Sequence, residues 1–122
     1  MQPRFAGQPL IDAYGDMGFR LAGQRFEGSI ILTPQGLYPW NVSALGEATL
    51  ESLAPIIGHT ETFDFLLIGS GAKFVRFSKN IAAFLAGRRI MPDFMDTGAA
   101  CRTYNVLRGE DRRVAAALIA VA

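Results

Sequence analysis

The side chain most suited to covalent chemistry is Cys101, the one cysteine in the chain, which is followed by Arg102. A helix start and a neighbouring guanidinium both lower the pKa of a thiol, and the resulting thiolate is a nucleophile. Nucleophilic catalysis also needs a base within hydrogen-bond reach. The one histidine, His59, lies in a predicted loop, and no pattern places it near Cys101. Buried cysteines usually pack as small apolar residues, so we interpret Cys101 as a core residue, with a reactive thiol as the alternative.

A small-residue turn, Gly69-Ser70-Gly71, directly follows a predicted strand. Glycine lets a ligand approach backbone N–H groups closely, and ligands of open α/β sheets bind at the carboxyl ends of strands. A dinucleotide fingerprint would need a third glycine opening a helix, and Phe74 stands at that position. The turn is therefore interpreted either as an ordinary tight turn or as a ligand cradle. Because the strand needs a sharp exit, we expect a positive φ at Gly69 or Gly71.

A second turn, Asp96-Thr97-Gly98, opens the last predicted helix. If the strands before the two turns are parallel, both turns face the same edge of the sheet. A helix N-terminus offers N–H groups to an anion, but the Asp96 carboxylate would repel one, and Asp is a common helix cap. Capping is the main interpretation and an anion site the alternative. The candidate ligand crevice consists of Gly69, Ser70, Gly71, Asp96 and Thr97.

A candidate interaction patch consists of Arg102, Asn105 and Trp40. Arg102 and Asn105 are three residues apart and share a face of the last predicted helix. Trp is enriched at interface hot spots, so Trp40 could anchor a partner. The alternatives are a solvated helix face and a tryptophan packed in the core.

Composition restricts the class of protein. The 122 residues suit one domain, and a hydrophobic share of 50% with 19% charged residues indicates a globular chain. A net charge of +1 gives too weak a field to hold a phosphate backbone, so we expect no nucleic acid partner. One cysteine forms neither an internal disulfide nor a cysteine-based metal site. We therefore expect no metal, no cofactor and a reducing, cytoplasmic location.

Membrane-spanning and targeting segments are not expected either. The longest uninterrupted apolar run, residues 114–122, is far shorter than the ~20 residues that span a bilayer. The first residues lack the apolar run of a signal peptide. The pattern predicts a soluble protein without a transmembrane segment.

The first half of the chain predicts mainly antiparallel strands. Residues 1–18 lack a period and predict an irregular lead-in to a single domain over residues 19–122. Alternating apolar residues predict a three-stranded meander over residues 19–40, with turns at Gly23-Gln24 and at residues 33–36. Apolar residues at helical spacing then predict a helix that begins near residue 46 or 47 and that Pro55 ends early or kinks.

The second half alternates strands and helices. Residues 63–69 predict a central strand covered on both faces, and Ser78 and Gly87 bound a helix. Residues 90–95 predict a short strand, which Pro92 restricts to an edge or a bulge. A helix from residue 96 or 97 to about 107 and a strand over 114–121 complete the chain. This alternation predicts an α/β fold with a largely parallel core, and the initial hairpin makes the sheet mixed.

Several stretches of the chain resemble a known family. They are FEGSIILTPQGLYPW (26–40), LLIGSGAK (66–73), and MDTGAACRTYNVL (95–107) followed by RRVAAALIAV (112–121). The chain resembles a small α/β domain family that includes the mitochondrial complex I (NADH:ubiquinone oxidoreductase) assembly factor three. The resemblance covers about residues 11–121, and AACRTYN is its most specific part. Pro92 departs from the pattern expected for the family.

The resemblance implies a three-layer α/β fold around a mixed, mostly parallel five-stranded sheet. It also implies a non-enzymatic role in building a respiratory complex through contacts with other assembly proteins, and it supplies no catalytic residues. The first hypothesis is therefore a non-catalytic interaction or assembly module with a protein partner. The alternative is a small-molecule or anion-binding protein or enzyme that uses the candidate crevice. A deep pocket lined by Ser70, Asp96 and Thr97 would favour the alternative, and a filled crevice with an exposed apolar patch near Trp40 would favour the first.

Overall fold

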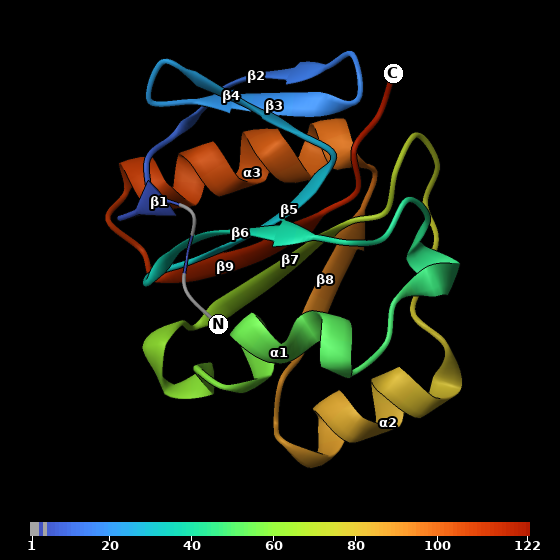
Figure 1. The fold of residues 1–122 in the computed structure, drawn as a ribbon. Helices are drawn as coiled ribbons and strands as arrows, with labels where there is room; N and C mark the ends of the chain where they lie inside the picture. Colours follow the sequence, from blue (N-terminus) through green and yellow to red (C-terminus); the bar gives the residue numbers. More distant parts are fainter. Residues whose placement is uncertain (1–2, 4) are drawn as a thin grey trace.

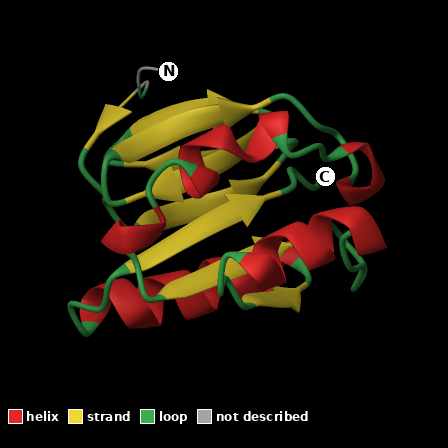
Figure 2. Ribbon diagram, turned by 90° about the horizontal axis from the view of Figure 1, so that it is seen from below, coloured by secondary structure: helices red, strands yellow, loops and turns green. Residues whose placement is uncertain are grey.

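The computed structural model describes residue 3 and residues 5–122, and it shows a mixed α/β fold with two β-sheets. Figure 1 shows the layers: a small sheet lies on one side of helix α3 (Thr97–Gly109), and the large sheet lies on the other side. Helices α1 (Ala54–Ile57) and α2 (Lys79–Gly87) cover the far face of the large sheet, and Figure 2 shows them lying across its strands. The fold therefore has one layer more than the expected three, because the small sheet lies outside α3.

The large sheet has six strands in the order β1-β6-β5-β9-β7-β8 within the described part of the chain. Their bounds are Phe5–Ala6 (β1), Gly36–Trp40 (β6), Ser29–Thr33 (β5), Val114–Leu118 (β9), Phe65–Gly69 (β7) and Pro92–Met95 (β8). Strand β7 pairs in parallel with β9 and β8, and the other three pairings are antiparallel. The sheet is mixed, as predicted, and five strands of four or five residues match the expected five, with the two-residue β1 as a sixth. The expected mostly parallel pairing is wrong. The reason is that the β5–β6 hairpin pairs antiparallel with β9, and the short β1 extends the edge.

The small sheet consists of β2 (Ile11–Gly15), β3 (Gly18–Leu21) and β4 (Gln24–Glu27), all antiparallel. The predicted irregular lead-in over residues 1–18 is thus wrong for residues 5–6 and 11–15, which are strands, whereas residues 1, 2 and 4 lie outside the described part. The β3–β4 loop is Ala22-Gly23, with φ of 51° and 75°. Two positive φ values are typical of a type I′ hairpin turn, which begins one residue before the predicted position.

Gly28 explains why the predicted meander does not form one sheet. Its φ of +80° lies in the left-handed region that favours glycine, and it separates β4 from β5. The run predicted as one strand over residues 26–32 therefore becomes two strands in two different sheets. The second hairpin, β5–β6, forms at the predicted turn, with Thr33 opposite Gly36.

The helical predictions succeed in the second half and fail in the first. The expected helix from residue 46 or 47 is wrong: residues 45–47 and 51–53 form single 3-10 turns, and α1 spans four residues. Pro55 occupies the first turn of α1, where its missing N–H would lack a helical partner anyway, so it begins the helix instead of ending it. Ser78 accepts a hydrogen bond from Ile81 N and caps α2 as predicted. Pro92 is the first residue of the edge strand β8, which confirms the predicted edge.

Two hydrophobic cores lie on the two faces of the large sheet. Alternate residues of β9 pack into the two cores. Ala115 and Ala117 face the core beneath α1 and α2, whereas Val114, Ala116 and Leu118 face the core beneath α3. All five are fully buried. Small side chains on both faces of β9 let the covering helices approach the sheet closely. Among the described residues, no helix is both long and apolar enough to cross a lipid bilayer.

Candidate functional site

The two predicted turns meet at the carboxyl ends of β7 and β8, as the sequence indicated. Thr97 N donates to Gly71 O at 2.8 Å, and Gly71 N donates to Thr97 Oγ1 at 3.0 Å. The same hydroxyl donates to Ile119 O at 2.7 Å, just beyond β9. Thr97 is fully buried. Its hydroxyl therefore joins two strand ends to the start of α3, and the space predicted as a ligand crevice is filled by the protein itself.

Ser70 is also occupied by internal hydrogen bonds. Its backbone N donates to Met95 O at 2.8 Å, and its hydroxyl donates to Lys73 O at 2.6 Å and accepts from Val75 N at 3.0 Å. These bonds fix the loop that leaves β7. Ser70 and Gly71 do border an open hollow of 390 Å³ on the outer side of the turn, which residues 119–122 also line. Neither Asp96 nor Thr97 lines that hollow.

The two glycines serve different purposes. Gly71 has a φ of +106°, which confirms the expected positive φ at one of the two positions. Gly69 is required by packing: a Cβ atom there would lie 2.9 Å from Leu118 Cδ2 and 3.1 Å from Thr97 Cα. The small residues of this turn thus allow close approach of protein to protein.

Asp96 caps α3, as the main interpretation of the sequence held. Its Oδ1 accepts a hydrogen bond from Ala99 N at 2.9 Å, so a carboxylate already satisfies the N–H group that an anion would need. Among the described residues, no group of three or more His, Cys, Asp or Glu side chains is placed to hold a metal ion.

Cys101 lies in the core beneath α3, with 2% of its surface exposed. Burial raises the pKa of its thiol to about 12, and the favourable field of Arg102 offsets this only in part. His59 lies two residues after the end of α1, and α1 covers the face of the large sheet opposite α3 (Figure 1). The structure therefore confirms the interpretation of Cys101 as a core residue and separates it from the one histidine.

Cys101→Ser is expected to lower the free energy of unfolding by about 1–3 kcal/mol, because it buries a hydroxyl in an apolar site. The native thiol is also expected to react slowly with a thiol reagent at neutral pH, because little thiolate forms when the pKa is about 12. Denaturant unfolding and timed labelling measure the two effects, with Cys101→Ala as the apolar control. Labelling as fast as that of a cysteine in a short peptide would contradict the core assignment.

The predicted interaction patch does not form one surface. Trp40 is 3% exposed, and its Nε1 donates to Ser52 Oγ at 3.2 Å. It packs in the core beneath α1 and α2, away from α3. Asn105 accepts a hydrogen bond from Ile11 N at 2.8 Å and donates to Ile11 O at 2.9 Å, so its amide holds the start of β2. Of the three residues, Arg102 is the exposed one, and its Nη1 donates to Tyr14 Oη at 3.3 Å.

The polar side chains of Tyr104 and Asn105 on α3 are thus structural. Besides the Asn105 pair, Tyr104 Oη donates to Pro9 O at 2.8 Å, and burial raises the Tyr104 pKa above its ordinary value. Gly98 lets Tyr14 approach α3, since a Cβ atom there would lie 2.6 Å from Tyr14 Oη. Sequence periodicity does not indicate these partners, which lie about ninety residues earlier in the chain.

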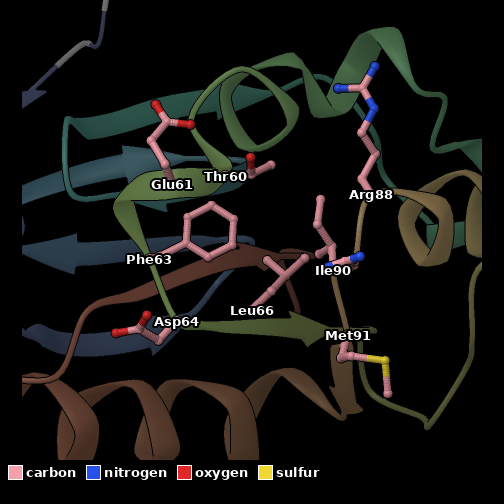
Figure 3. Close-up of a pocket in the computed structure, with 9 residues that line it drawn as sticks. Thr60, Glu61, Phe63, Asp64, Leu66, Arg88, Ile90 and Met91 are labelled. Atoms are coloured by element: carbon pink, nitrogen blue, oxygen red, sulfur yellow. The ribbon is translucent and has the colours of Figure 1, made fainter.

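A small cavity of 230 Å³ lies at the opposite end of β7 (Figure 3). The side chains of Phe63, Leu66 and Ile90 converge in it, whereas Arg88 and Glu61 extend away from its centre (Figure 3). Asp64 lines it too, but its carboxylate forms a two-bond ion pair with Arg113, at 2.7 and 3.0 Å. This pairing lowers the Asp64 pKa. The cavity offers an apolar floor with charged residues at its rim, and no pattern in the sequence indicates it.

Comparison with known proteins identifies the family. A family described as proteins of unknown function (DUF498/DUF598) matches residues 11–119. The chain belongs to this family. A protein from Rhodobacter capsulatus is 36% identical over 97% of this chain and 90% of its own length. A solved structure described as an outer membrane protein from Bartonella henselae has a TM-score of 0.92 at 41% identity, covering 98% of this chain and 100% of that one.

Relatives in this DUF498/DUF598 family include proteins named for assembly. The Xenopus tropicalis protein named NADH dehydrogenase (ubiquinone) 1 alpha subcomplex assembly factor 3 is 32% identical to this chain. The match covers 90% of this chain but 60% of that protein. The chain therefore spans less than two thirds of the length of this assembly factor.

Proposed function

We propose that this DUF498/DUF598 protein is a non-catalytic protein-interaction module that acts in the assembly of respiratory complex I or another membrane complex. The names of its relatives support an assembly role. The observation that favours an interaction module over an enzyme is that the predicted ligand crevice is filled. Thr97 is fully buried and hydrogen-bonded to both Gly71 and Ile119. A ligand in that crevice would have to displace these bonds, each of which satisfies a buried backbone group.

The proposed partners are proteins. A net charge of +1 gives little general attraction to nucleic acid. Catalysis would require a nucleophile, a base and a charge stabiliser within reach of one another. Cys101 is buried beneath α3, whereas His59 follows α1, a helix on the opposite face of the large sheet (Figure 1). A free thiol at Cys101 agrees with a reducing, cytoplasmic location.

The test is deletion of the gene in its native host, provided that the host has complex I. The proposal predicts less fully assembled complex I on native gels, accumulation of partial complexes, and recovery when the wild-type gene is returned. The purified protein is expected to show no turnover in hydrolase and oxidoreductase screens. Unchanged levels of assembled membrane complexes in the deletion strain would contradict the assembly role. A turnover that Ser70→Ala abolishes would instead support the alternative of a small-molecule enzyme.

A further inference from the structure

Charge is strongly segregated along this chain. Residues 65–92 contain five Lys and Arg residues and no Asp or Glu. Residues 1–64 contain three arginines and seven acidic residues, and residues 93–122 contain four of each sign. The near-neutral total therefore hides one segment of charge +5. This segment covers β7, the following loop, α2 and the approach to β8.

All five cations of this segment are exposed: Lys73, Arg76, Lys79, Arg88 and Arg89. None of them forms an ion pair with another residue in the described part of the chain. Other arginines do have carboxylate partners, as in the pairs of Arg25 with Glu27 and of Arg113 with Asp64. The protein itself therefore leaves the positive charge of this segment uncompensated.

Exposed apolar side chains lie among these cations. Phe74 is 56% exposed, and Arg76 lies over its ring at 5.3 Å and over the Phe94 ring at 5.9 Å. Arg88 lies over the half-buried Phe84 at 4.8 Å. Met91, which directly precedes the edge strand β8, is 82% exposed. Guanidinium groups stacked on aromatic rings are held in place, which lowers the entropy lost when a partner binds them.

These residues occupy one side of the molecule. Figure 1 shows the loop after β7 leading into helix α2, which lies on the face of the large sheet opposite α3. The two acidic residues that flank this segment in sequence, Asp64 and Asp93, line a hollow together with Met91, so carboxylates border the surface at that end. We call the surface formed by residues 73–79 and 84–91 the basic face.

We infer that the basic face is the docking surface for an acidic protein segment that carries apolar side chains. The inference rests on the proposed function, because it names the chemistry of the partner of that interaction module. Unpaired exposed cations complement carboxylates, and Phe74 beside Arg76 and Met91 beside Arg88 and Arg89 offer apolar contact. A protein segment that carries both carboxylates and apolar side chains therefore complements both the cations and the exposed apolar residues of the basic face.

Two other classes of partner fit this surface less well. A lipid surface is bound by an amphipathic helix with a free apolar face, but α2 uses its apolar residues Ile81 and Leu85 in the core. A nucleic acid backbone needs a basic field around the binding surface, and here Glu61 and Asp64 border the cavity beside Arg88 and Arg89. A protein segment of mixed character tolerates such flanking carboxylates.

The test uses a fluorescently labelled synthetic peptide in which Asp and Glu alternate with Phe and Leu. Fluorescence anisotropy measures the binding of this peptide to the intact protein. A peptide with Asn and Gln in place of the acids is the ligand control. The wild-type protein is expected to bind the acidic peptide, with weaker binding as ionic strength rises to about 0.15 M. The variant Lys73→Glu, Lys79→Glu, Arg88→Glu is expected to bind it about tenfold more weakly or worse.

The matched protein control is Arg20→Glu, Arg102→Glu, Arg112→Glu, which changes the net charge by the same amount on other surfaces. It is expected to bind like the wild type. Equal loss in both variants would overturn the inference, because binding would then follow net charge alone. Loss in the control variant only would place the contact on α3 or the small sheet, against the inference.

Further probes separate the inference from its rivals and from the proposed function. Stronger binding to phosphatidylglycerol vesicles or to oligothymidine than to the acidic peptide would overturn it, and so would failure of the wild type to bind the peptide. Neither result bears on the deletion experiment, which tests the assembly role independently of this surface. Unchanged thermal midpoints in both variants establish that the compared proteins are folded.

Discussion

Thr97→Val is expected to lower the free energy of unfolding by about 2–6 kcal/mol. Valine has nearly the shape of threonine, so the change removes the hydroxyl without creating a large cavity. Two buried backbone groups then lose their partner: Gly71 N, 3.0 Å from the hydroxyl, and Ile119 O, at 2.7 Å. Each buried group left unsatisfied costs about 1–3 kcal/mol. Urea unfolding of the purified variant measures the loss.

The matched control is Thr97→Ser, which keeps the hydroxyl and removes one methyl group. It is expected to lose far less stability than Thr97→Val, although it deletes more buried apolar surface. A second control, Thr103→Val, alters a half-buried threonine on the same helix whose hydroxyl contacts Met95 Sδ at 3.5 Å, and it is expected to be nearly neutral. A Thr97→Val protein as stable as the wild type would show that the hydroxyl is not structural, and would reopen the crevice as a ligand site.

The parts of the fold that the sequence predicted are those with strong local signals. Strand β7 is apolar on both faces, Ser78 and Asp96 are side-chain caps, and Pro92 restricts its strand to an edge. Each of these signals acts within a few residues, so no long-range contact overrides it. These local signals predict β7, β8 and the start of α3, the elements that bring the two turns together.

The failures come from positions where the outcome depends on distant packing. Gly28 could have continued a strand, but its positive φ turns the chain from one sheet into the other. The apolar spacing of residues 50–57 is helical, yet those residues form 3-10 turns and a four-residue helix. Burial of Leu53 and Ile56 satisfies the pattern without a continuous helix, since periodicity reports which side is buried and not how the backbone is bonded.

For the candidate site, the sequence predicts which residues lie close together but not whether the space between them is filled. Proximity of residues 69–71 and 96–97 follows from parallel strands, and it is observed. The filling of the space between them depends on Ile119, which comes from a third strand end, and no local pattern indicates that contact. Polar residues on a helix face indicate a recognition surface, but the sequence does not reveal that β2 lies over that face.

Asn105→Ala is expected to detach the start of β2 from α3. The Asn105 amide accepts from Ile11 N at 2.8 Å and donates to Ile11 O at 2.9 Å. Ile11 is 6% exposed, so water does not readily replace these bonds. The expected cost is about 2–4 kcal/mol for two backbone groups left without partners. Because 1.4 kcal/mol corresponds to a factor of ten, the exchange rate of the Ile11 amide hydrogen should rise about 30- to 700-fold if opening is local.

Hydrogen exchange distinguishes this structural role from recognition. Amides of β7 and β9 should keep most of their protection in Asn105→Ala, because those strands pack beneath α3 rather than above it. Val106→Ala, at a neighbouring exposed position, is the control and should leave β2 protected. Asn105→Asp keeps an acceptor for Ile11 N but sets a carboxylate oxygen against Ile11 O, so it should open β2 at least as much as alanine. If Asn105 were instead a contact for a partner, Asn105→Ala would weaken partner binding and leave Ile11 exchange unchanged, and that result would contradict the structural role.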